Sequence, residues 1–234
     1  MVQGGLRTVF WLGFFGIVLW AWWVMFSMTI APIPMMPSQL VGLFSLWAIM
    51  MAAMMGPTFV PTMRAYEDLI TSANGSRAGS VGVVLGFFVV WVGFAGLIAL
   101  TQYWLIEIGL LTAMGKSVSK LFSASLLLAA GVYQFTALKD RCIDHCRSPM
   151  FQFLAHWRPG FVGGIHMGLH HGIYCVACCW GLMVIGFVGG TMDLLWMGGA
   201  TVLMTLEKLP DLGRLLTRPL GFGLIVWGLV TLVL

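Results

Sequence analysis

Histidine and cysteine, two residue types that bind transition metals, concentrate in one stretch of the chain, from Cys142 to Cys179. Thiolate sulfur and imidazole nitrogen are ligands for copper, zinc and iron, whereas calcium and magnesium prefer oxygen. The stretch therefore predicts a site for a soft or borderline metal ion. Copper is favoured among these ions, and zinc and iron are the alternatives.

The first part of the stretch reads Lys139-Asp-Arg-Cys-Ile-Asp-His-Cys-Arg-Ser-Pro, and we expect it to be a loop before the fifth apolar run. Cys142 and Cys146 are four residues apart, with His145 between them. On a helical turn, residues at this spacing lie on one face, so two thiolates and an imidazole could share one ion. The alternative is a pair of buried cysteines without a ligand role.

The fifth apolar run contains three histidines and three cysteines. His166 and His170 share one face of a helix, and His171, Cys175 and Cys178 share another. A rise of 1.5 Å per residue separates Cys178 from His166 by about 18 Å, so one ion cannot contact both ends. We expect a shallow ligand group and a deeper one. The shallow group is Cys142, His145, Cys146, His166 and His170; the deeper group is His171, Cys175, Cys178 and Cys179.

Packing competes with ligation for these residues. A cysteine in an apolar helix is often a small hydrophobic residue with no further role, whereas histidine in a membrane span is costly and tends to be functional. Methionines at 50, 51, 54 and 55 offer thioethers that suit copper(I), but methionine also fills apolar interiors. Glu207 is a candidate ligand or a partner that orients a histidine. It could equally form a simple pair with Lys208.

Long apolar runs must carry these residues. The chain is 60% hydrophobic and only 9% charged, whereas a soluble domain carries roughly a quarter charged residues. Lipid is therefore the expected solvent, and unbroken runs of about 17 to 25 residues favour helices over a barrel. We predict a single all-α transmembrane domain, 1–234, with about seven spans. They lie near 9–30, 40–63, 81–105, 121–138, 161–187, 190–206 and 217–234.

Lysine and arginine predict the orientation of the bundle. With the N-terminus inside, ten basic residues fall in cytoplasmic segments and only two, Lys116 and Lys120, in outer ones. Cytoplasmic loops are enriched in these residues, so we predict a cytoplasmic N-terminus and a site at the cytoplasmic end. The run from Val9 to Ile30 is longer than a signal-peptide core and is expected to remain as the first helix.

Four ordered motifs resemble a bacterial family of predicted metal-binding integral membrane proteins, domain of unknown function 2182. The resemblance covers the chain from about Met50 to Leu209. The motifs are Ala48-Ile-Met-Met-Ala-Ala-Met-Met-x-Pro, Tyr133-Gln-Phe-Thr-Ala-Leu-Lys-x-x-Cys-x-x-His-Cys-Arg-Ser-Pro, Gly168-Leu-His-His-Gly-x-Tyr-Cys-x-x-Cys-Cys-Trp and Met204-x-Leu-Glu-Lys-Leu. The resemblance implies metal binding, a bacterial inner-membrane location and nine motif residues as ligand candidates. These are Cys142, His145, Cys146, His170, His171, Cys175, Cys178, Cys179 and Glu207.

Copper handling is the leading functional hypothesis, as transport, chaperoning or insertion into another protein. The alternatives are a membrane metalloenzyme, an accessory or scaffold subunit of such an enzyme, and thiol–disulfide exchange. A cytoplasmic location disfavours an oxidising role for the cysteines. The expected partners are the lipid bilayer and either another membrane subunit or a metallochaperone. Scattered basic residues give no nucleic-acid signal.

Overall fold

A computed structural model describes residues 2–30, 40–72, 77–191 and 193–234. In these ranges the chain forms ten helices and no strand, which confirms the predicted all-α class. The helices are α1 (Val2–Ile30), α2 (Leu40–Ser72), α3 (Arg77–Glu107), α4 (Lys120–Tyr133), α5 (Ala137–Arg147), α6 (Pro149–Ala155), α7 (Gly160–Val184), α8 (Gly186–Gly189), α9 (Leu194–Glu207) and α10 (Pro210–Val233).

Five stretches are long and apolar enough to cross a membrane: Arg7–Met28, Leu40–Ile70, Arg77–Glu107, Gly160–Gly189 and Pro210–Val233. A sixth results if the bent pair α4 and α5 counts as one span. Helix α9, where we expected another span, has 14 residues. It is therefore only about 21 Å long, less than the roughly 30 Å of a hydrocarbon core. The expected count of seven and the expected orientation stay predictions.

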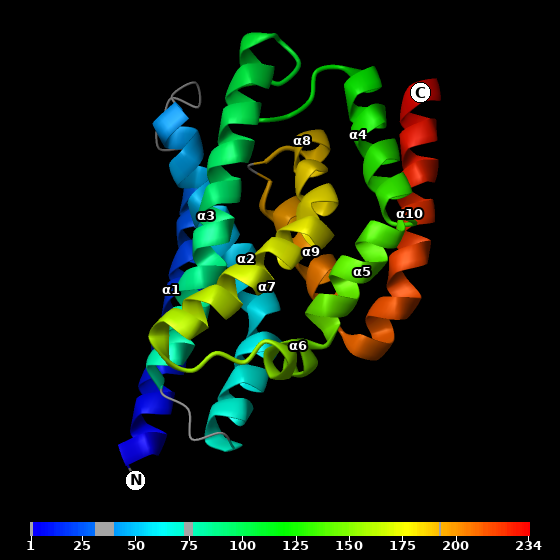
Figure 1. Cartoon of the computed structure of the whole chain (residues 1–234). Coiled ribbons are helices and arrows are strands. Elements are labelled where there is room, and N and C mark those ends of the chain that lie inside the picture. The colour runs from blue at the N-terminus through cyan, green and yellow to red at the C-terminus, as the bar shows by residue number, and fades with distance from the viewer. Residues whose placement is uncertain (1, 31–39, 73–76, 192) are drawn as a thin grey trace.

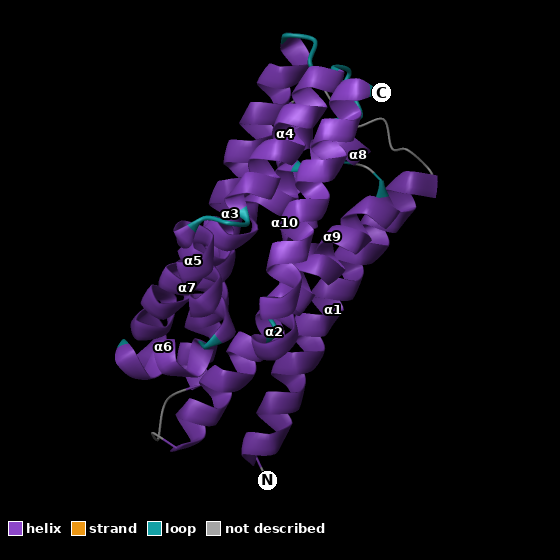
Figure 2. Ribbon diagram, turned by 90° about the vertical axis from the view of Figure 1, so that its right-hand side faces the viewer, coloured by secondary structure: helices purple, strands orange, loops and turns teal. Residues whose placement is uncertain are grey.

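The long helices run between two ends of the molecule, with the N-terminus at one end and the C-terminus at the other (Figures 1 and 2). Helices α1, α2 and α3 pack in sequence order, and α4 packs against α10. Helix α7 crosses between these two groups and has its most extensive contact with α3. This central position brings the expected ligands on α7 close to several other helices.

Glycines bring α3 and α7 into backbone contact. A Cβ atom at Gly86 would clash with the backbone oxygen of Ile165, and one at Gly168 would clash with that of Val83. Small residues permit such close approach of apolar helices. The contact holds α7 against α3 directly before His170 and His171.

The polypeptide bends between α4 and α5, by 66°. Helix α4 ends at Tyr133, and the Thr136 side chain caps α5 by accepting a hydrogen bond from the Lys139 amide. The expectation of a loop around Cys142 is therefore wrong, because these residues form a helix. Its side chains at Lys139, Cys142, His145 and Cys146 are buried. The bend turns this helix inward, so that it packs against α7.

Candidate metal centre

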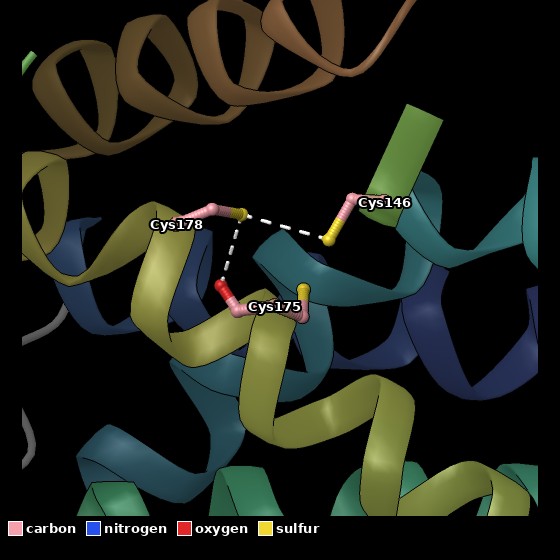
Figure 3. Close-up of side chains that lie close together, drawn as sticks. All are labelled: Cys146, Cys175 and Cys178. Atoms are coloured by element: carbon pink, nitrogen blue, oxygen red, sulfur yellow. Dashed lines mark hydrogen bonds between the residues drawn. The ribbon is translucent and has the colours of Figure 1, made fainter. Parts of the chain in front are cut away.

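Three buried cysteines from two helices form a compact sulfur group. Cys146 lies near the end of α5, and Cys175 and Cys178 lie one turn apart on α7 (Figure 3). Their sulfur atoms all lie within 4.8 Å of one another. The sulfurs of Cys146 and Cys178 are 3.7 Å apart, and the sulfur of Cys179 lies 3.3 Å from that of Cys178. We refer to Cys146, Cys175 and Cys178 as the cysteine group.

The spacing of these sulfurs suits a shared ion. Metal–sulfur bonds are about 2.3 Å long, so two sulfurs on one ion lie about 3.8 to 4.6 Å apart. All five cysteines are free thiols, and the distances in the group are far longer than the roughly 2.05 Å of a disulfide. Small side-chain adjustments would therefore bring all three sulfurs onto one ion.

A lysine places a positive charge against the group. The ammonium of Lys208 lies 3.0 Å from the sulfur of Cys175 and donates a hydrogen bond of 2.9 Å to the hydroxyl of Thr58. Lys208 is 9% exposed. Among the described residues, no carboxylate forms an ion pair with it. The thiolate is the form of cysteine that binds metals. The positive charge of Lys208 favours this form at Cys175.

A second buried lysine attaches α5 to α9 and α7. The ammonium of Lys139 forms an ion pair of 2.9 Å with Glu207 and donates a hydrogen bond of 2.7 Å to the backbone oxygen of Cys178. Arg147 also donates to the backbone oxygen of Glu207, at 2.9 Å. These contacts hold the helix that carries Cys146 at the turn of α7 that carries Cys178. Glu207 thus lies outside the cysteine group and pairs with lysine.

The structure divides the expected ligands differently from the sequence analysis. Cys146, which we placed in the shallow group, lies with the deeper Cys175 and Cys178. Cys142 is buried one turn earlier on α5 and is not a member of the cysteine group. The expected histidines His145, His166, His170 and His171 instead line a separate pocket. That pocket also contains His156, which the sequence analysis did not include.

Methionines of α2 are buried close to this region. Met50, Met51, Met54 and Met55 are at most 1% exposed. The sulfur of Met55 lies 3.8 Å from the hydroxyl of Thr58, the same hydroxyl that accepts from Lys208. Methionine ligation of an ion remains a prediction, and dense packing also accounts for this burial.

Sequence reasoning missed the two buried lysines and Thr58. Lys139 and Lys208 were counted as topological charges in loops, yet Lys139 is fully buried. A signal was present in the sequence, because both lysines stand inside the motifs that also contain Cys142 and Glu207. A basic residue inside a ligand motif is a candidate for an internal charge partner.

The chain matches the profile of one known protein family. No curated protein and no solved structure matches the chain. The profile of one protein family, PpoB2, described as a copper chaperone, matches residues 44–231. This match supports a copper-related family. Membership in the family of domain of unknown function 2182 stays a prediction. The matched region contains the cysteine group, both buried lysines and all five histidines. The chain therefore belongs to the PpoB2 copper chaperone family.

Proposed function

We propose that this chain is a multi-pass protein of the bacterial inner membrane that binds copper(I) at Cys146, Cys175 and Cys178 and passes it to a partner protein. The observation that carries the proposal is the convergence of three buried sulfurs from two helices within 4.8 Å. The copper chaperone family supports the choice of metal. The five or six apolar helices support the membrane location.

The ligand chemistry favours copper(I) over the alternatives. Soft thiolates select copper(I), zinc or iron–sulfur clusters, while structural zinc sites use four ligands in a closed tetrahedron. The cysteine group supplies three sulfurs within bonding range of one ion, and the charged group that contacts the Cys175 sulfur is the cation Lys208. Each thiol that binds the ion releases a proton. A singly charged ion adds less positive charge beside Lys208 than a divalent ion does.

The number of ligands also suits transfer. A structural metal site is closed, whereas a site that keeps an open position can accept a further ligand. Three sulfurs leave such a position on a four-coordinate ion, and a ligand of the partner could enter there before the cysteines release the ion. We therefore propose delivery, to a metallochaperone or a membrane subunit, rather than permanent retention.

The distribution of charge supports a site nearer the cytoplasmic end. Two of the ten basic residues counted as cytoplasmic, Lys139 and Lys208, are buried, which leaves eight against Lys116 and Lys120. The bias toward one side persists, and cytoplasmic segments are the ones enriched in lysine and arginine. Helix α6 directly follows the end of α5 that carries Cys146. It lies in the half of the molecule nearer the N-terminus, whereas the connection between α3 and α4 lies at the opposite end (Figures 1 and 2).

Metal content of the purified protein tests this function. Protein from copper-replete cells is analysed for copper, zinc and iron per chain, and X-ray absorption at the copper edge reports the ligands. We expect sulfur-bound copper in the natural protein and its loss in the Cys146→Ser/Cys178→Ser double variant. Fully stable natural protein without sulfur-bound copper would contradict the proposal.

A further inference from the structure

All five histidines of the chain line one pocket between α5, α6 and α7. They are His145 on α5, His156 at the end of α6, and His166, His170 and His171 on α7. We infer that this pocket is a second metal site, an outer port that takes up the copper ion before it reaches the cysteine group. The inference rests on the proposed copper function, and we call the pocket the histidine port.

The ring spacings of the histidine port match those of imidazoles that share an ion. A metal–nitrogen bond of about 2.0 Å places the ring centre about 3.2 Å from the ion, so two bound rings have centres about 5 to 6.5 Å apart. The ring centres of His145 and His170 are 5.2 Å apart, as are those of His156 and His170. The rings of His145 and His171 are 6.2 Å apart. These pairwise spacings allow two neighbouring rings at a time to bind an ion.

The hydrogen bonds of two histidines leave one ring nitrogen of each for a ligand. The Nδ1 atom of His156 lies 3.3 Å from the backbone oxygen of Gln152, and the Nε2 atom of His171 lies 3.1 Å from the hydroxyl of Thr62. Metal-binding histidines commonly use their second nitrogen in this way, which fixes the ring. The remaining nitrogens are Nε2 of His156 and Nδ1 of His171.

Two buried histidine nitrogens lack hydrogen-bond partners in the described part of the chain. They are Nε2 of His145 and Nδ1 of His171, and the two residues are 8% and 4% exposed. Buried polar atoms are almost always hydrogen-bonded, so an orphaned one requires an explanation such as an ion. These two belong to the innermost histidines of the port. A metal ion would satisfy them.

The pocket can hold one ion, and the exposure of its histidines decreases from the surface inward. The pocket has a volume of about 20 Å³, and a cavity needs roughly 10–15 Å³ to admit one water molecule, so it has room for a single ion. His156 and His166 are exposed, His170 is half-buried, and His145 and His171 are buried. An ion can therefore bind first at exposed imidazoles and move inward by exchange of one histidine for the next.

The inner end of the port adjoins the cysteine group on both helices. His145 directly precedes Cys146 on α5, and His171 lies one turn, about 6 Å, before Cys175 on α7. The pocket lining contains no carboxylate, which disfavours calcium or magnesium. Imidazoles also bind copper less strongly than soft thiolates do. The ligand order from nitrogen to sulfur therefore favours inward movement of copper(I).

Stoichiometry and ligand type test the histidine port. The purified full chain is loaded with copper(I) without oxygen, and X-ray absorption separates nitrogen ligands at about 2.0 Å from sulfur at about 2.3 Å. We expect two copper ions in the natural protein, one bound by nitrogen and one by sulfur. The Cys146→Ser/Cys178→Ser variant should keep one nitrogen-bound ion. The His156→Ala/His170→Ala variant should keep one sulfur-bound ion and load it more slowly.

A matched control is Gln152→Ala, which alters the same pocket but leaves the backbone oxygen that His156 contacts. It should bind both ions. A natural protein that binds one copper through sulfur alone overturns the histidine port while the proposed function stands. Nitrogen-bound copper without any sulfur-bound copper would contradict the proposed function and leave the histidine port as a metal site. His156 is exposed and His170 half-buried, so their double variant keeps the test decisive even if the cysteine variant does not fold.

Discussion

Cys146 and Cys178 place their sulfur atoms 3.7 Å apart, although 32 positions separate them along the chain. Cys146 lies on helix α5 and Cys178 lies on α7. The bend before α5 and the hydrogen bond from the Lys139 ammonium to the backbone oxygen of Cys178 bring the two helices together. The cysteine group therefore exists only in the folded protein.

The first prediction compares two cysteines of α5. Cys146→Ser removes a sulfur of the cysteine group and should weaken copper(I) binding by at least about 10-fold, because even partners of metal ligands contribute this much. Cys142→Ser changes an equally buried residue one turn away. It should weaken binding by less than about 3-fold, well below that range. Competition with a copper(I) chelator measures both, and equal losses would add Cys142 to the ligand set.

The second prediction concerns the ion pair of Lys139 and Glu207, whose side chains are 1% and 2% exposed. Lys139→Met leaves a buried carboxylate without its cation and should destabilise the protein by about 3–5 kcal/mol. Lys139→Met/Glu207→Leu removes both charges and should recover most of that stability. Denaturant titration in detergent measures both variants. Equal destabilisation of the single and double variants would contradict a charge effect.

The third prediction uses the glycine contact between α3 and α7. Gly168→Ala puts a methyl group against the backbone oxygen of Val83 and should cost about 1–3 kcal/mol through overpacking. Gly93→Ala is the control on α3, since no atom lies within 4 Å of its added Cβ. It should change stability by about 1 kcal/mol or less. Thermal unfolding distinguishes the two, and similar behaviour would argue against a close helix contact.

The fourth prediction tests the orientation. Arg158→Cys and Lys116→Cys introduce single exposed thiols, while all five natural cysteines are buried. With the N-terminus inside, an impermeant maleimide should label Arg158→Cys only from the cytoplasmic side and Lys116→Cys only from the outer side. The unaltered chain provides the background. The reverse pattern of labelling would place the histidine port outside the cell.

Helical class, apolar character and the segment that carries the candidate ligands followed from the sequence alone. These properties are local: hydropathy along a run sets the helix, and a period of 3.6 residues sets which side chains share a face. The shared face of His171, Cys175 and Cys178 was predictable for that reason. Their grouping with Cys146 was not, because it depends on how α5 meets α7.

Tertiary packing decided the remaining features of the site. It converted the expected loop around Cys142 into a buried helix and brought His156 into one pocket with four histidines from α5 and α7. It also placed Lys208 beside Cys175, 33 positions away. Such contacts arise where distant helices meet, and their meeting depends on backbone approach at glycines and on buried charge pairs. Periodicity within one helix carries no information about which other helix it will face.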